Sequence, residues 1–286
     1  MNGIVIVDKP SGWTSQDVTA RLRRVFNTRR IGHGGTLDPM ATGVLPVFVG
    51  RATRGVEFFE HAEKTYETLL LPGVTTDTED ITGTVLRRQA VSLTEADVEA
   101  VLPRFRGEIL QVPPMYSALK VNGQKLCDLA RKGTEIERKP RPVTIHALTF
   151  LGFQEGMVKL RVRCSKGTYI RTLCKDIGEA LGCGGCMAQL RRTQAGSYDI
   201  TEAIPLQTLL DTQEPEKYLA SVDTLFSQYP AVTLTANQET RCRNGNPFSL
   251  QIPDGTYRAY SRDGEFLMLA KAESGVMSTI KSFFAV

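Results

Sequence analysis

The apolar positions of this chain follow two periods in short segments, and each period predicts a kind of element. Residues 3–7 are apolar and rich in β-branched side chains, which is typical of a buried strand. The apolar residues that follow recur at helical spacing, so we expect a helix from an N-cap at Thr14 or Ser15 through Val25. The chain therefore opens with a predicted strand and a predicted helix.

The same two periods continue through the larger part of the chain. The expected strands cover residues 44–50, 65–71, 84–90, 141–153, 157–164 and 187–195. The expected helices cover residues 51–61, 94–105, 169–181 and 215–226. Thr94 is the N-cap expected for the second of these helices, and Gly182 ends the third. Because strands and helices are interspersed, the pattern favours a mixed α+β fold.

The pattern changes near residue 230, after the pair Tyr229-Pro230. From there on, short predicted strands alternate with turn signals. The strands are expected at residues 231–235, 256–261 and 265–271, with turns at Asp254-Gly255 and Asp263-Gly264. We therefore expect a domain boundary within about ten residues of position 230, followed by a small β-rich domain.

Residues 114–142 are the least core-like part of the larger domain. The segment begins with two prolines near Pro114, contains the hairpin signal Asn122-Gly123, and continues as a short basic helix. A long segment of this kind inside a compact domain is often functional. We therefore expect residues 114–142 to contribute to a binding surface.

One acid, Asp38, lies in a run of small residues from Gly32 to Pro46. Pro39 follows it directly and His33 lies five positions before it. Glycines permit close backbone approach, so a flat and bulky ligand can reach this carboxylate. The simpler interpretation is a glycine-rich turn in which Asp38 is a capping residue.

This run is one of five motifs that occur in a fixed order over about the first two-thirds of the chain. The other four are residues 8–15 (DKPSGWTS), 64–66 (KTY), 165–171 (SKGTYIR) and 190–192 (LRR). Together they resemble the motifs of the TruB family of tRNA pseudouridine synthases. The chain has Gly34 where that family often has Thr, and Cys186 near the place of a family His. We expect the first difference to loosen the loop slightly and the second to weaken the role of that His.

The resemblance implies a fold, a division into domains and an activity. The fold would be a mixed, largely antiparallel sheet with flanking helices in a catalytic domain, residues 1–229, plus a small C-terminal PUA-like β domain that binds RNA, residues 230–286. Residues 114–142 would be a loop insertion that closes over the T-arm of tRNA. The activity would be isomerisation of the uridine at position 55, in the T-loop, after its base has been flipped into a pocket.

The resemblance also implies three catalytic residues. Asp38 would be the catalytic carboxylate, which either attacks carbon or stabilises a developing cation. Arg171 would keep it ionised and orient it. Tyr66 would be an aromatic platform for the base and a candidate acceptor for the proton on C5. Without the resemblance, Tyr66 reads as a core residue of a strand and Arg171 as a solvated arginine or a phosphate contact.

Four further residues are implied to contact the substrate. His33 would occupy the space that the flipped base leaves in the T-loop, by stacking. Tyr169 and Leu190 would line the pocket of the uracil, although both types also occur in ordinary cores. Lys9 lies in a turn beside the Asp38 loop, where it would support that loop and contact RNA.

Charge and cysteine content limit the remaining possibilities. The net charge is +4, and basic residues concentrate near residues 21–30, 120–141 and 161–192, which suits a phosphate backbone. The pair Cys183 and Cys186 has the spacing of zinc ligands, but no second pair completes a site, and we expect all six cysteines to be reduced. Isomerisation needs neither redox chemistry nor group transfer, so we expect no metal and no cofactor.

The start of the chain has no basic leader, and no apolar run is as long as a membrane helix, so we expect a cytoplasmic protein outside the membrane. The expected partner is tRNA, bound by a monomer that needs no other protein. Two alternatives stay open from the sequence: an RNA-binding module without catalysis, and a synthase that works with a guide RNA or on rRNA.

Overall fold

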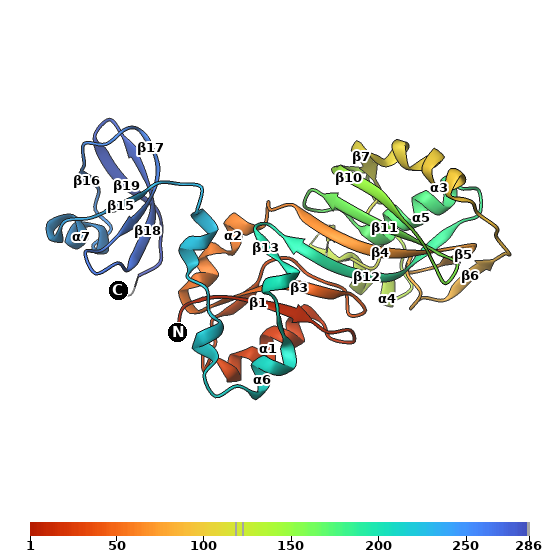
Figure 1. Ribbon diagram of the computed structural model, residues 1–286, viewed down its shortest axis with the longest axis horizontal. Helices are drawn as coiled ribbons and strands as arrows, with labels where there is room; N and C mark the ends of the chain where they lie inside the picture. The colour runs from red at the N-terminus through yellow and green to blue at the C-terminus, as the bar shows by residue number, and fades with distance from the viewer. Residues whose placement is uncertain (118, 122, 285–286) are drawn as a thin grey trace.

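A ten-stranded sheet carries most of the core in the computed structural model, which describes residues 1–117, 119–121 and 123–284 (Figure 1). Its strands are β1 (Gly3–Lys9), β2 (Ile31–His33), β3 (Thr42–Val49), β4 (Lys64–Pro72), β7 (Gly107–Gln111), β10 (Arg141–Gln154), β11 (Met157–Cys164), β12 (Gly185–Ala195), β13 (Tyr198–Asp199) and β14 (Ile204–Pro205). The main order is β14-β1-β3-β12-β4-β11-β10-β7. Only the β1–β14 and β3–β12 pairs are parallel, so the expected mixed, largely antiparallel sheet is confirmed.

The two halves of this sheet meet at the short parallel pair of β3 with β12. Arg191 pairs with Thr42 and Arg192 with Gly43. Gly43 has a φ of 100°, and a Cβ atom there would lie 2.2 Å from the carbonyl oxygen of Arg192, so only glycine fits. The buried side chain of Arg192 donates to the carbonyls of Val44 (2.7 Å) and Gly35 (3.1 Å). This seam therefore fixes the start of β3 beside the Asp38 loop.

Helices flank the sheet, as expected. The longer ones are α1 (Ser15–Val25), which begins with a capping box between Thr14 and Asp17, and α5 (Ile170–Ala180). Shorter ones are α2 (Val56–Phe59), α3 (Glu95–Val101), α4 (Leu126–Arg131) and α6 (Leu206–Asp211). Helix α5 buries one face completely, and each buried side chain such as Leu173 contributes about 1.5–3 kcal/mol.

A second sheet of five strands forms the C-terminal part of the described chain. It contains β15 (Ala231–Thr233), β16 (Phe248–Ser249), β17 (Gly255–Tyr260), β18 (Phe266–Glu273) and β19 (Val276–Ser282), with helix α7 (Ala236–Arg243) beside it. It lies at one end of the molecule, away from the free edge β7 of the large sheet (Figure 1). An aromatic cluster of Phe226, Phe266 and Phe283 joins it to the first part of the chain, and the Tyr260 hydroxyl donates to Asp223 at 2.5 Å.

Two small hairpins project from the large sheet. Strands β5 (Val74–Thr76) and β6 (Val85–Arg88) form one of them. Strands β8 (Lys120–Val121) and β9 (Gln124–Lys125) form the other, within the insertion 114–142 and just before α4. The expected hairpin signal at Asn122-Gly123 falls here, although Asn122 itself lies outside the described residues.

Two of the helix predictions were wrong in part. Residues 51–61 form a 3₁₀ helix, η1 (Gly50–Gly55), and the single turn α2. Residues 215–226 form two 3₁₀ helices, η4 (Pro215–Tyr218) and η5 (Val222–Phe226). They are separated at Ala220, whose backbone N–H and C=O both bond to Ile4 at 2.8 Å. Pairing with β1 therefore breaks the helical pattern at that point.

The sequence pattern did not predict helices α6 and α7 or strands β2, β5, β7, β13, β14, β16 and β19. The turn expected at Asp254-Gly255 falls at the bend just before β17. Helix α6 has only six residues, α7 has a weak apolar pattern, and β16 has only two residues. In the part of the chain that is described, no helix combines the length and the apolar character that crossing a membrane requires.

Candidate active site

A cavity of about 340 Å³ opens where the Asp38 loop, strand β4 and the start of α5 meet. Its volume is within the range of pockets that bind small organic groups. Five of the residues expected from the sequence line it: Asp38, Tyr66, Tyr169, Arg171 and Leu190. The fold therefore brings together residues from four separate motifs.

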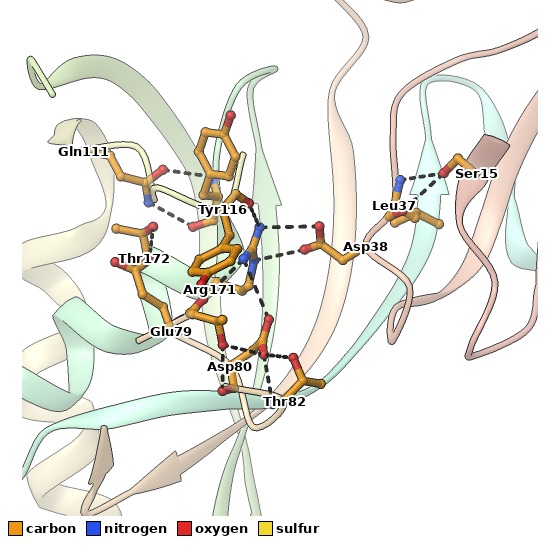
Figure 2. Close-up of polar contacts among 12 residues, drawn as sticks. Ser15, Leu37, Asp38, Glu79, Asp80, Thr82, Gln111, Tyr116, Arg171 and Thr172 are labelled. Atoms are coloured by element: carbon orange, nitrogen blue, oxygen red, sulfur yellow. Dashed lines mark hydrogen bonds and ion pairs between the residues drawn. The ribbon is translucent and has the colours of Figure 1, made fainter. Parts of the chain in front are cut away.

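Asp38 and Arg171 form a two-pronged ion pair at the mouth of this cavity, although 133 residues separate them in the chain. Arg171 Nε lies 3.0 Å from Asp38 Oδ2, and Arg171 Nη2 lies 3.4 Å from Oδ1. Figure 2 shows the guanidinium and the carboxylate facing each other. The Arg171 side chain is 6% exposed and that of Asp38 is 34% exposed, so the carboxylate is the member of the pair that a ligand can reach.

Further acceptors hold the Arg171 guanidinium in place. Nη2 donates to the carbonyl of Tyr116 (2.9 Å), and Nη1 donates to that of Thr78 (3.2 Å). Nη1 also lies 3.7 Å from the buried carboxylate of Asp80. Asp80 in turn accepts hydrogen bonds from the hydroxyl and the N–H of Thr82 (Figure 2). A guanidinium with this many fixed acceptors presents a single orientation to Asp38.

The charge state of Asp38 depends on two opposing effects. Burial raises its pKa above the ordinary value, and the neighbouring Arg171 guanidinium acts most strongly against that rise. The Asp80 carboxylate adds to the rise, whereas the Lys9 ammonium opposes it. Arg171 is therefore the main group that limits the rise in the pKa of Asp38.

The Asp38 loop is tied to the first motif of the chain. The Ser15 hydroxyl accepts from the N–H of Leu37 (2.9 Å) and lies 3.2 Å from its carbonyl (Figure 2). The ammonium of Lys9 donates to the carbonyls of Pro10, Trp13 and Pro39 at 2.6–3.2 Å. Lys9 is completely buried, which lowers its pKa to about 8. These contacts fit the expected supporting role of Lys9 and leave its ammonium no surface for RNA.

Two aromatic side chains and one leucine form walls of the cavity. Tyr66 lies on β4 and is 9% exposed; burial raises its pKa, so it is a neutral phenol near pH 7. Tyr169 is the N-cap residue of α5, and Leu190 lies on β12. A planar base placed in the cavity would therefore meet apolar and aromatic surface next to the carboxylate.

His33 does not line this cavity. It lies on β2 and lines a neighbouring cavity of about 440 Å³, which shares Asp38, Arg171, Tyr116 and Ser117 with the first. Burial lowers the pKa of His33, and its Nδ1 atom has no hydrogen-bond partner among the described residues. Asp38 and Arg171 thus line both cavities, whereas His33 lines only the second.

Sequence analysis missed several residues of the site. Lys64 and Arg192 both line the first cavity; burial lowers the pKa of Lys64 to about 8. Both residues stand in motifs of the chain, and this membership could have identified them as residues of the site. Asp80 lies in a polar turn that carries no chemical signature, and the contact of Arg171 with Tyr116 is made by a backbone carbonyl, which no residue type reveals.

The two departures from the family motifs also have a place in the structure. A Cβ atom on Gly34 would lie 2.5 Å from Cδ1 of Phe59, so the Phe59 ring occupies that space and packs on the loop. The space of a larger side chain at this position is therefore filled by Phe59, and the loosening expected at Gly34 stays a prediction. Cys186 is completely buried on β12. Among the described residues, all six cysteines are free thiols, and no group of three His, Cys, Asp or Glu side chains suits a metal ion.

The basic clusters divide between surface and site. The five arginines between residues 21 and 30 are exposed, as are Arg161, Arg163 and Lys166. Arg171 and Arg192, by contrast, are buried in the site. The exposed members therefore remain the ones available to a polyanion.

Comparisons with known proteins agree with this arrangement. The model of the TruB family pseudouridylate synthase N-terminal domain matches residues 23–170, and that of the tRNA pseudouridylate synthase B C-terminal domain matches residues 171–225. A curated tRNA pseudouridine synthase B of Stutzerimonas stutzeri is 43% identical, over 93% of this chain and 90% of the relative. One of Clostridium kluyveri is 41% identical, over 99% and 100% of the two chains.

Solved structures show the same fold. A chain of a Cbf5-Nop10-Gar1 complex matches with a TM-score of 0.73 and 26% identity, over 99% of this chain and 85% of that chain. A chain of an H/ACA RNP bound to a substrate RNA containing 2'-deoxyuridine also gives 0.73, at 24% identity, over 99% and 85%. Both matches extend across the two sheets of the molecule.

Proposed function

Because the chain belongs to the TruB family of pseudouridylate synthases, we propose that it isomerises a uridine of tRNA to pseudouridine, at position 55 in the T-loop. The observation that carries this proposal is the Asp38–Arg171 ion pair at the mouth of a base-sized cavity. A binding module gains nothing from a carboxylate that faces an anionic RNA backbone. A glycosidic rearrangement, in contrast, needs an ionised carboxylate close to the sugar and the base.

The reaction breaks the C1′–N1 bond of the uridine, turns the released uracil, and joins its C5 to C1′. C5 loses a proton and N1 gains one, so substrate and product are isomers. Asp38 supplies the carboxylate, whether it attacks the sugar or the base. Arg171 holds this carboxylate in one orientation and keeps it ionised, as its two contacts at 3.0 and 3.4 Å support.

The walls of the cavity confine the base while it is detached. Tyr66 and Leu190 offer flat and apolar surface, and stacking on an aromatic ring is worth about 1–3 kcal/mol per base. Tyr169 borders the same space. Tyr66 is a neutral phenol near pH 7, so its main role is to stack on the base. Its hydroxyl stays the candidate acceptor for the proton that leaves C5.

The remaining contacts with tRNA follow from the layout of the chain. Residues 1–229 form the catalytic domain, and residues 230–286 form a PUA-like RNA-binding domain. His33 stacks in the T-loop from the second cavity, and the insertion 114–142 covers the T-arm. Flipping the base out of its stack costs a few kcal/mol, which these contacts offset. The enzyme acts as a cytoplasmic monomer without a cofactor or a protein partner.

The direct test measures pseudouridine at every position of an unmodified tRNA transcript after incubation with the purified protein alone. We expect product at the T-loop uridine only, and none with Asp38→Asn. If the protein binds the transcript tightly and in a salt-sensitive way but forms no pseudouridine, the enzymatic function is refuted. Product that appears only after a guide RNA is added would refute the stand-alone function, and product at other positions would refute the T-loop assignment.

A further inference from the structure

The side chain of Gln111 pairs with the backbone of Tyr169 through two hydrogen bonds. Its Nε2 donates to the Tyr169 carbonyl at 3.0 Å, and its Oε1 accepts from the Tyr169 N–H at 2.8 Å (Figure 2). Gln111 is 2% exposed and ends β7, 58 residues before its partner. The side-chain amide of Gln111 thus makes the same two hydrogen bonds to the Tyr169 backbone that a residue of a neighbouring β-strand would make.

This pairing matters because Tyr169 is the N-cap residue of α5 and lacks a capping hydrogen bond from its own side chain. The first N–H groups of a helix have no partner within the helix, and a buried donor without a partner costs about 1–3 kcal/mol. The Tyr169 carbonyl accepts from Leu173 as well, in the first turn of α5. Gln111 therefore fixes the residue from which the helix starts.

The start of α5 carries the groups that face the substrate. The Tyr169 ring borders the first cavity, and Arg171, two residues further, holds Asp38. A displacement of about 1 Å in such a group can lower a rate by about a hundredfold. The orientation of both side chains thus depends on a residue that lies outside the cavity lining.

Gln111 also marks the point where the insertion leaves the sheet. Five residues later, the carbonyl of Tyr116 accepts a hydrogen bond from Arg171 at 2.9 Å. The chain is therefore joined to the start of α5 at two nearby residues, Gln111 and Tyr116, where the insertion begins (Figure 2). If the insertion shifts when tRNA binds, these hydrogen bonds connect that shift to the position of Arg171.

We propose that Gln111 is a positioning residue of the reaction, which sets Tyr169 and Arg171 against the target nucleotide and fixes the insertion to the helix that carries them. This inference rests on the proposed function. It differs from a general stabilising role because it assigns the effect of Gln111 to the chemical step, whereas affinity for tRNA comes mainly from phosphate contacts elsewhere.

The test compares two substitutions of Gln111 with a matched control. Gln111→Met keeps the length of the side chain and removes both hydrogen bonds, and Gln111→Glu keeps the acceptor for the Tyr169 N–H. The control is Gln89→Met, because Gln89 donates to the carbonyl of Cys183 at 2.9 Å, just beyond the other end of α5. All three variants are assayed for kcat and KM on the same tRNA transcript, with thermal unfolding alongside.

We expect Gln111→Met to lower kcat about 10- to 100-fold with KM within about twofold of the wild type. Gln111→Glu should retain more of kcat, and Gln89→Met should lose stability while kcat stays within about twofold. An unchanged kcat in Gln111→Met, an equal loss in Gln89→Met, or a loss confined to KM would each overturn the proposal. If Gln111→Met does not fold, Gln111→Ala replaces it, because it also removes both hydrogen bonds and is judged by the same criteria. If neither variant folds, an unchanged kcat in Gln111→Glu overturns the proposal. Wild-type protein without product would refute the proposed function instead.

Discussion

Replacement of Arg171 tests whether this residue controls the ionisation of Asp38. In Arg171→Met the carboxyl stays buried and loses its main counter-charge. Two unit charges about 4 Å apart interact by about 4 kcal/mol at an effective dielectric constant of 20. A third of the Asp38 side chain is exposed, so solvent screening reduces this to about 2 kcal/mol. At about 1.4 kcal/mol for each pH unit, this loss corresponds to an upward shift of about 1.5 pH units in the titration of Asp38.

The assay is the single-turnover rate of pseudouridine formation as a function of pH. We expect the alkaline plateau of Arg171→Met to begin about 1.5 pH units higher than in the wild type. The deficit in the rate of this variant should therefore be largest at low pH and should narrow as pH rises. Arg171→Lys keeps the charge but not the two-pronged contact, so its midpoint should shift less while its plateau stays low.

Lys175→Met is the control for this experiment, because Lys175 lies on the same helix and contacts Glu79 and Glu179 outside the cavity. It should leave the midpoint unchanged. A lowered rate in Arg171→Met with the same midpoint as the wild type would refute the reasoning, because Arg171 would then act on something other than the charge of Asp38.

Substitutions of Tyr66, Lys9 and Gly34 also have defined outcomes. Tyr66→Phe should keep the base-stacking surface, whereas Tyr66→Ala should lose about 1–3 kcal/mol of it; equal single-turnover rates for the two would contradict a stacking role. Lys9→Met should lower the free energy of unfolding by about 1–3 kcal/mol, because three carbonyls lose a donor. The slope of log Kd for tRNA against log salt should stay unchanged, and a smaller slope would show that Lys9 contacts a phosphate. Gly34→Ala should cost about 1–3 kcal/mol in urea unfolding through its clash with Phe59, and Phe59→Leu should relieve part of that cost.

The sequence predicted the parts of the fold that local patterns encode. The helix beginning after Thr14 has a capping box and an apolar face, and the helix beginning after Tyr169 has an apolar face. The strands from Lys64 and Met157 have clear β composition. The largely antiparallel sheet was implied only by the family resemblance, and the order of its strands was not predicted. The interruption at Ala220 was not predictable, because it results from pairing with Ile4 at the other end of the chain.

The same distinction applies to the site. Asp38, Tyr66 and Arg171 were identified because each stands in a motif, and the structure places all three around one cavity. Asp80 and Gln111 act through side-chain contacts with distant segments, and the Tyr116 carbonyl belongs to the backbone. Nothing in their local sequence distinguishes such residues from ordinary polar positions, since only the folded chain brings their partners within reach.

The seam between β3 and β12 has a consequence for the order of folding. Asp38 and Arg171 lie 133 residues apart and come from opposite sides of a parallel pairing that spans two residue pairs. Closing so long a loop costs chain entropy, and non-local pairings of this kind form slowly. The two halves of the sheet can each form before they join. A chain in that state has most of its secondary structure but lacks the Asp38–Arg171 ion pair. Recovery of activity during refolding should therefore trail the circular dichroism signal and report when the two halves have joined.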